Sequence, residues 1–163
     1  GLLSLWAYEG VPKKAIGKLK YKFVKSIAFE LVNPLATFLK ERRRDKFTIV
    51  PIPLYWMREN YRGFNQAEEM AKLLSEQIER KVETLLIRTK RTKSQVGLKE
   101  RERKKNIEGV FSMSKDYCLV PNNSYLILLD DVWTTGSTIK EGAKVLKQQG
   151  FSKVWGLTLA RGI

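Results

Sequence analysis

Short apolar runs alternate along the chain with longer amphipathic segments. The runs are bounded by polar or turn-forming residues and are too short for stable helices, so they predict strands. These strands are predicted at residues 47–51, 82–87, 109–113, 125–130 and 153–159. No polar residue interrupts Leu126 to Leu129, which is typical of a strand buried on both faces of a parallel sheet.

Between the runs, apolar residues recur at helical spacing. Helices are predicted over residues 64–80 and 137–149, the second ending before Gly150. The inward positions of the first helix are Ala67, Met70, Ala71, Leu74 and Ile78. Another apolar helical face runs from Phe23 through Val24 to Leu39, and Pro34 is expected to kink or split that helix. Strands alternating with helices indicate an α/β fold with a mostly parallel sheet and helices on both sides.

The strand predicted at 125–130 leads into the most distinctive stretch of the chain. Asp130 and Asp131 stand at its end, and Thr134, Thr135, Gly136, Ser137 and Thr138 form the turn into the next helix. Backbone N–H groups and hydroxyls at a helix N-terminus favour a phosphate. The two carboxylates can accept hydrogen bonds from sugar hydroxyls or help hold Mg²⁺.

Two other interpretations account for parts of this stretch. A buried strand ending in Asp-Asp also occurs in P-loop nucleotide hydrolases, but the chain has no G-x-x-x-x-G-K-[ST] segment. A purely structural strand–turn–helix junction explains one Asp and the Gly, but not the whole set of carboxylates and hydroxyls. A site for a phosphorylated sugar is therefore the favoured interpretation.

These residues resemble the phosphoribosyl pyrophosphate (PRPP) motif of type I phosphoribosyltransferases. Further segments are similar to the ComF family of competence-associated proteins, and the resemblance runs from about Tyr8 to Arg161. They are Tyr8–Gly10, Val50–Leu54, Tyr61–Ala67 and Gln95–Leu98, followed by Arg103, Asn106, Gly109 and Phe111. Many ComF-type proteins also carry a four-cysteine zinc module, which this sequence lacks. Zinc is therefore not expected here.

The resemblance implies a three-layer, type I phosphoribosyltransferase-like fold in one domain, residues 1–163. A helical N-terminal segment, residues 1–45, would form a small hood over an α/β core, residues 46–163. The implied function is PRPP binding with Mg²⁺-dependent phosphoribosyl transfer or PRPP hydrolysis, linked to DNA uptake and natural competence. The alternative is a non-catalytic PRPP sensor or a competence factor that binds single-stranded DNA.

The resemblance also implies a role for individual residues. Thr134 to Thr138 would hold the 5-phosphate, and Asp130 and Asp131 would act at the ribose hydroxyls. Arg62, and after it Arg103 or Arg101, would contact pyrophosphate, because a guanidinium can donate two hydrogen bonds to one phosphate. Mg²⁺ would enter with PRPP, without a direct protein ligand set.

Four further residues are expected at the cleft, namely Asn65, Gln66, Gln95 and Trp133. Asn65 is equally well explained as a helix cap, and Trp133 either packs in the fold or stacks on an acceptor base. In 6-oxopurine phosphoribosyltransferases the position of Thr134 holds an acid that serves as general base. A threonine hydroxyl cannot act as a general base near neutral pH, so the sequence does not identify the acceptor substrate.

Composition adds one strong feature, a net charge of +14 in 163 residues. Half of it lies between Arg88 and Lys105, where nine basic residues accompany two acidic ones. Because apolar periodicity is lost there, the segment predicts a loop that meets phosphate or polyanions. Its expected contacts are Arg88, Lys90, Arg91, Lys93, Lys104 and Lys105.

What the chain lacks excludes several classes of protein. It has no histidine, which excludes Ser-His-Asp or Cys-His catalysis and H-E-x-x-H metal sites within it. Its single cysteine, Cys118, excludes an internal disulfide. No apolar run approaches the ~18 residues of a membrane span, so we expect a cytoplasmic protein without membrane insertion. The candidate partners are PRPP or another phosphoribosyl compound, single-stranded DNA, competence-machinery proteins and a second copy in a homodimer.

Overall fold

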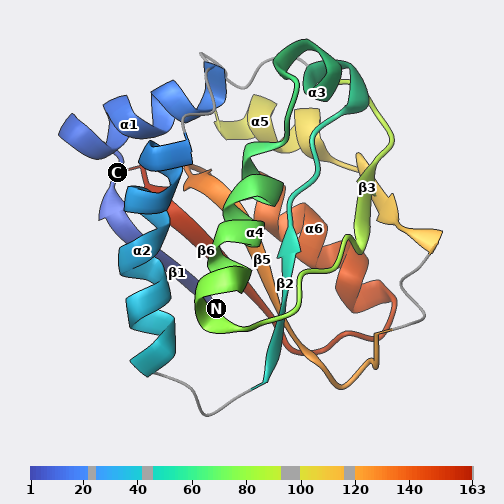
Figure 1. Cartoon of the computed structure of the whole chain (residues 1–163). Helices are drawn as coiled ribbons and strands as arrows, with labels where there is room; N and C mark the ends of the chain where they lie inside the picture. Colours follow the sequence, from blue (N-terminus) through green and yellow to red (C-terminus); the bar gives the residue numbers. More distant parts are fainter. Residues whose placement is uncertain (22–24, 42–45, 93–99, 116–119, 163) are drawn as a thin grey trace.

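A four-stranded parallel sheet forms the centre of the molecule (Figure 1). The structure is a computed structural model that describes residues 1–21, 25–41, 46–92, 100–115 and 120–162. The strands, in spatial order, are β1 (Leu2–Ala7), β6 (Val154–Arg161), β5 (Tyr125–Trp133) and β2 (Phe47–Pro51). Because all four are parallel, their carboxyl ends meet at one edge, where ligands bind in open α/β sheets.

Helices cover both faces of this sheet. One hydrophobic cluster joins the sheet to α1 (Gly10–Tyr21), α2 (Lys25–Glu41) and α4 (Gln66–Ile78). The other cluster joins the opposite face to α6 (Ser137–Gln148) and α5 (Glu100–Ile107). It also includes the short antiparallel pair β3 (Leu86–Arg88) and β4 (Phe111–Met113). One further helix, α3 (Trp56–Arg62), follows β2 at the carboxyl edge of the sheet. The three layers confirm the predicted fold class.

Several predicted elements appear with small changes. β2 has the predicted bounds, and the five inward positions of α4 are buried. The strand predicted at 82–87 is divided: Val82 forms an isolated bridge to Ile49, and only Leu86 and Ile87 lie in β3. Pro34 lies inside α2 without splitting it. Phe23 and Val24 lie outside the described residues. Within the described ranges, no helix has both the length and the apolarity needed to cross a membrane.

Two segments differ from the prediction. Residues 1–45 were expected to be a helical hood, but Leu2–Ala7 form the edge strand β1, which pairs with β6 and places the Ser4 hydroxyl 2.6 Å from that of Thr158. The basic stretch was expected to be a loop, but residues 100–107 form helix α5. Burial of Ile107 and Val110 in the second cluster fixes its C-terminal end. In both cases contacts with distant segments determine the local structure.

Candidate functional site

The start of α6 has the geometry of an anion site. Gly136, the residue before the helix, has φ +74°, a left-handed conformation that other residues adopt only with strain. Its carbonyl accepts a hydrogen bond from the Lys140 N–H at 2.9 Å. The helix has no acidic residue in its first turn, and no side chain of the N-cap residue closes it. Its first N–H groups therefore point toward a place suited to a phosphate.

The hydroxyls of Thr135 and Ser137 stand beside this helix start. They are hydrogen-bonded to each other, and the Ser137 N–H lies 3.4 Å from the Thr135 hydroxyl. Ser137 is buried, whereas Thr134 is exposed. We call the segment Thr134–Thr138 the cradle. The structure thus brings the predicted phosphate residues together at one turn.

Trp133 holds the cradle in shape. A Cβ at Gly136 would stand 2.1 Å from Cζ2 of Trp133, so the ring occupies the space that any other residue would need. The Trp133 carbonyl accepts from the Gly162 N–H at 2.7 Å, and the ring packs against the second cluster. The Lys140 ammonium lies 5.5 Å from the ring centroid and 3.3 Å from the Thr135 carbonyl oxygen. Of the two roles considered for Trp133, packing is the one with contacts in the structure.

The two carboxylates lie within β5, because the strand continues past them to Trp133. Side chains of successive strand residues point to opposite faces. The Asp131 side chain, 5 % exposed, accepts from Nε2 of Gln66 in α4 at 3.3 Å. Its backbone N–H donates to Oδ1 of Asp130 at 2.8 Å. Asp131 is thus on the α4 face and already engaged by the fold.

Asp130 belongs to the face that carries α6. It is in register with Thr158 of β6. Gly156 lies two residues before Thr158 in β6, so both residues point to the same face of the sheet. A Cβ at Gly156 would lie 2.9 Å from Ile139 of α6, so this is the face that α6 covers. Asp130 is half-buried, unlike its neighbour. The carboxylate on the side of the cradle is therefore Asp130.

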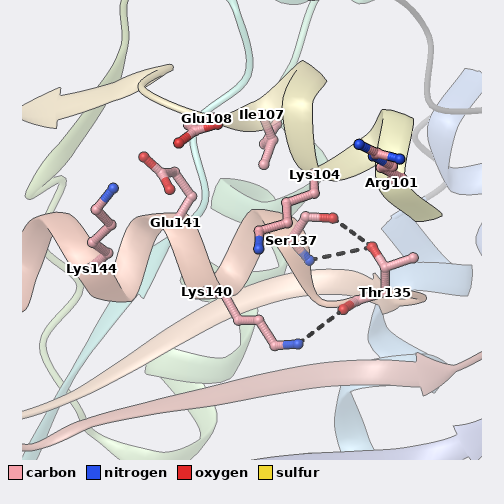
Figure 2. Close-up of a pocket in the computed structure, with 9 residues that line it drawn as sticks. All are labelled: Arg101, Lys104, Ile107, Glu108, Thr135, Ser137, Lys140, Glu141 and Lys144. Atoms are coloured by element: carbon pink, nitrogen blue, oxygen red, sulfur yellow. Dashed lines mark hydrogen bonds between the residues drawn. The ribbon is translucent and has the colours of Figure 1, made fainter.

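A pocket of about 880 Å³ opens between α5 and α6 (Figure 2). Thr135 and Ser137 of the cradle form part of its wall. The other lining residues, mostly charged, are Arg101, Lys104, Ile107, Glu108, Lys140, Glu141 and Lys144. The Glu141 carboxylate accepts from the Gly109 N–H at 2.9 Å and so ties the end of α5 to α6.

Lys140 and Lys144 were missed by sequence reasoning. The signal was present, because Ser137, Lys140, Glu141 and Lys144 follow the three- and four-residue spacing of one helix face. A charged helix face of this kind usually indicates solvent-exposed surface. It becomes one wall of a pocket because α5 lies opposite it. Arg101 and Lys104, in contrast, were predicted to meet phosphate and do line the pocket.

The other predicted pyrophosphate and polyanion residues whose side chains are described do not line the pocket, and the rest have side chains outside the described part of the structure. Arg62 lies in α3 and Arg103 in α5, and their side chains are outside the described part of the structure. Gln95 and Lys93 lie outside the described residues. Lys90, Arg91 and Lys105 are exposed. Arg88 is engaged internally, since its guanidinium lies 5.7 Å from the Phe111 ring centroid and donates to the Thr92 hydroxyl.

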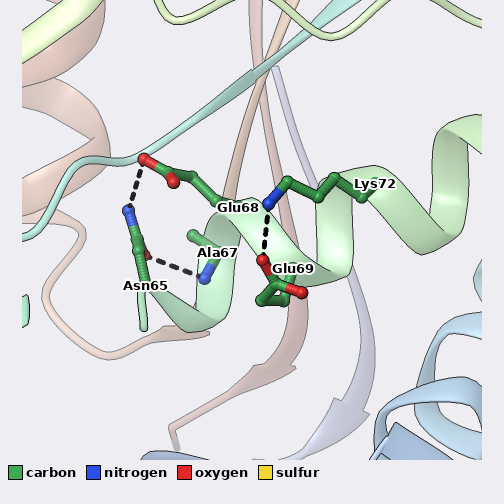
Figure 3. Close-up of polar contacts among 5 residues, drawn as sticks. All are labelled: Asn65, Ala67, Glu68, Glu69 and Lys72. Carbon is green, nitrogen blue, oxygen red and sulfur yellow. Dashed lines mark hydrogen bonds and ion pairs between the residues drawn. The ribbon is translucent and has the colours of Figure 1, made fainter. Parts of the chain in front are cut away.

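The start of α4, by contrast, is closed by its own side chains (Figure 3). Asn65, 2 % exposed, accepts from the Ala67 N–H at 3.0 Å and donates to the Ile52 carbonyl at 3.2 Å. It also donates to the Glu68 carboxylate at 3.1 Å. The capping role considered for Asn65 is therefore present, and Gln66 reaches the cleft residue Asp131.

Two titrating groups near α4 have shifted pKa values. The hydrogen bond to Glu69, 2.6 Å away, raises the pKa of Lys72. Burial, and then the charge of Glu68, raises the pKa of Glu59, while Lys72 opposes that shift. This end of the sheet edge is thus rich in carboxylates, whereas the cradle end is rich in cations.

Sequence comparison finds ComF-type relatives. The chain is 38% identical over 119 residues to Competence protein F of Haemophilus influenzae, covering 69% of the chain and 50% of that protein. It is 31% identical over 154 residues to Competence protein ComFC of Bacillus subtilis, covering 90% and 58% respectively. The DNA utilization protein YhgH of Escherichia coli is 34% identical over 107 residues, covering 65% and 45%. The chain belongs to the ComF family.

The chain spans about half the length of the curated relatives that it matches. No family model matches it. Among solved structures, the adenine phosphoribosyltransferase of Trypanosoma brucei aligns with a TM-score of 0.55 at 10% identity, covering 90% of this chain and 68% of the enzyme. A hypoxanthine phosphoribosyltransferase of Staphylococcus aureus aligns at 0.50 with 14% identity, covering 82% and 62%. These likenesses establish a type I phosphoribosyltransferase fold for this ComF-type chain.

Proposed function

We propose that this chain binds PRPP at the cradle and carries out Mg²⁺-dependent phosphoribosyl transfer or PRPP hydrolysis in DNA uptake. The observation that carries the proposal is the left-handed turn at Gly136 before a helix without acidic residues in its first turn. The hydroxyls of Thr135 and Ser137 adjoin that turn, and the Lys140 ammonium donates a hydrogen bond to the Thr135 carbonyl oxygen beside it. N–H groups, hydroxyls and a cation together make a suitable receptor for a dianionic 5-phosphate.

In this proposal Asp130 contacts the substrate and Asp131 positions Asp130. Asp130, on the cradle side of the sheet, accepts hydrogen bonds from the ribose hydroxyls. Asp131 supports it by holding Gln66 and donating its backbone N–H to the Asp130 carboxylate. Acidic oxygens placed near C1 also favour the positive charge that develops there as pyrophosphate leaves.

The residues present suit a magnesium ion that arrives with the substrate. Among the described residues, no group of three or more His, Cys, Asp or Glu side chains gathers into a metal site. Mg²⁺ is commonly bound by one or two carboxylates together with substrate phosphates. In this proposal the ion would be held through PRPP itself, and it would supply charge neutralisation of the pyrophosphate.

Calorimetry with PRPP, with and without Mg²⁺, tests binding, and pyrophosphate release tests turnover. We expect Asp130→Asn to weaken PRPP binding about tenfold or more, because a carboxylate that accepts from two hydroxyls becomes a poorer acceptor. Asp131→Asn should weaken it less. Wild-type affinity for PRPP in the Asp130 variant, with its fold intact by circular dichroism, would refute the assignment.

A binding function without turnover is the second candidate. It is favoured by Thr134, which stands where related purine enzymes place a general base, and by the basic groove between α5 and α6. Tight PRPP binding without pyrophosphate release across a broad acceptor panel would select it over the enzyme.

A further inference from the structure

The pocket extends well beyond the cradle. Thr135 and Arg101 lie at one end of it, and Lys144 lies at the other (Figure 2). From Ser137 to Lys144 the groove follows α6 for two turns, about 10 Å at the rise of an α-helix. Its volume of about 880 Å³ is near the upper end of ligand pockets. A single 5-phosphate fills only the cradle end.

Charge along the groove favours further phosphates. Cationic side chains come from both walls, Arg101 and Lys104 from α5 and Lys140 and Lys144 from α6. Of the two acidic lining residues, Glu141 is already bound to the Gly109 N–H. A positively charged groove of this kind follows the backbone of a nucleic-acid single strand.

The direction of the groove decides which part of a strand fits. This step rests on the proposed function, in which the ribose hydroxyls face Asp130 and the 5-phosphate lies in the cradle. Thr135 and Ser137 of the cradle line the groove, whereas Asp130 is not among the described residues that line it, so the groove adjoins the phosphate and not the sugar. A group seated there must be esterified to the 5-phosphate, while the sugar keeps its 3′-hydroxyl free.

Only the 3′-terminal nucleotide of a strand has both features. We propose that the site accepts the 3′-terminal nucleotide of a nucleic-acid single strand, with the preceding nucleotide in the groove between α5 and α6. Internal nucleotides and 5′ ends lack the free 3′-hydroxyl beside Asp130, so they bind only through the nonspecific charge of the surface.

Matched oligothymidylates of six nucleotides provide the test, with affinity measured by fluorescence anisotropy. We expect a 3′-phosphate to weaken binding at least tenfold relative to a 3′-hydroxyl, because it would bring a second anion against Asp130. Nonspecific attraction predicts the opposite sign, since an added phosphate increases the charge of the strand. Adding or removing a 5′-phosphate should change affinity less than twofold.

Three variants locate the effect. Asp130→Asn should remove the discrimination between the two 3′ ends. Lys144→Gln should weaken the 3′-hydroxyl strand about threefold to tenfold and lower the salt slope by about 0.7, the value for one lost contact to a single strand. Lys147→Gln, an exposed lysine of the same helix outside the pocket, is the matched control and should change neither.

The outcomes separate this inference from the proposed function. Equal affinity for the 3′-hydroxyl and 3′-phosphate strands, with PRPP still bound in calorimetry, overturns the inference alone. Failure to bind PRPP removes the proposed function and the inference with it. A 3′-hydroxyl strand that PRPP displaces supports both. Equal affinity for 5′-thymidylate and for the thymidylate dinucleotide would mean that the groove holds no preceding nucleotide and would overturn the assignment to a strand.

Discussion

The helices α4 and α6 both begin at the carboxyl edge of the sheet, yet their starts are built in opposite ways. Asn65 caps α4 through the Ala67 N–H, and Glu68 and Glu69 lie in its first turn. The start of α6 has Gly136 instead, no acidic residue in its first turn, and Lys140 nearby. The partial positive charge of a helix N-terminus is met by the protein itself at α4 and left for a ligand at α6.

This contrast distinguishes a structural helix start from a binding one. At α4 the polar groups are paired with each other and with the backbone, so substitution should cost stability. At α6 the geometry is held by a ring and a glycine, so substitution should cost affinity. The predictions that follow test whether these two costs can be separated.

The largest effect is expected at Gly136. Gly136→Ala introduces a Cβ at φ +74° and 2.1 Å from the Trp133 ring, so the ring must move. We expect PRPP affinity to fall about 100-fold or more, and stability to fall about 1–3 kcal/mol from strain and overpacking. Calorimetry and urea unfolding measure the two quantities.

Gly17→Ala in α1 is the control for Gly136→Ala. Its added Cβ meets no heavy atom within 4 Å, so PRPP affinity should stay at the wild-type value and stability should rise by up to ~1 kcal/mol. Normal PRPP binding by the Gly136 variant would mean that the left-handed turn is not part of the site.

The second prediction is that substitution at the start of α4 lowers stability and leaves PRPP affinity nearly unchanged. Asn65→Ala removes the cap and the hydrogen bond to the Ile52 carbonyl at a buried position. We expect the free energy of unfolding to drop about 2–3 kcal/mol, with PRPP affinity within about fivefold of wild type. Asn65→Ser keeps a capping oxygen without adding a charge beside Glu68 and should recover part of the stability. A larger loss of affinity than of stability would place Asn65 in the site.

Sequence reasoning anticipated local features better than distant ones. β2, α4 and the cradle follow from short-range periodicity and turn chemistry, and each appeared where expected. The strand β5 was predicted to end at Asp130, but its pairing of Val132 and Trp133 with β6 extends it. That extension places the two carboxylates on opposite faces, which no local pattern indicated.

Two further features required the tertiary structure. Leu2–Ala7 become a strand only because β6 offers them an edge. Helix α5 is so rich in charge that its pattern resembles a loop, and among its residues with described side chains Ile107 alone belongs to the second cluster. The pocket depends on α5 and α6 lying side by side, so the helix-face spacing that includes Lys144 indicates a groove only once α5 is in place.

The third prediction concerns the cation at the cradle. Lys140→Met removes an ammonium that lies beside Trp133 and the Thr135 carbonyl. We expect PRPP affinity to fall about tenfold, the value of one charge-assisted contact, and stability to change by less than about 0.5 kcal/mol. Lys153→Met is the control, because it also removes a cation from an aromatic ring, that of Tyr125, but outside the pocket. Equal losses in the two variants would contradict a role for Lys140 in anion binding.

The smallest effect is expected from the carboxylates around α4. Burial, and then the charge of Glu68, raises the pKa of Glu59 above its ordinary value. The folded state therefore holds this proton more tightly than the unfolded state, and wild-type stability declines as pH rises from the unfolded pKa through the folded pKa.

Glu59→Gln removes that decline. The variant should be slightly more stable than wild type at pH 7, and the difference should shrink toward pH 4, where Glu59 is largely protonated in both states. Urea midpoints at the two pH values measure it, with Glu76→Gln, at an exposed position of α4, as the control. Because much of Glu59 meets solvent, the effect is screened and should be strongest at low salt. A variant less stable than wild type at pH 7 would show that Glu59 is stabilised by its neighbours, and that the acidic start of α4 is balanced rather than repulsive.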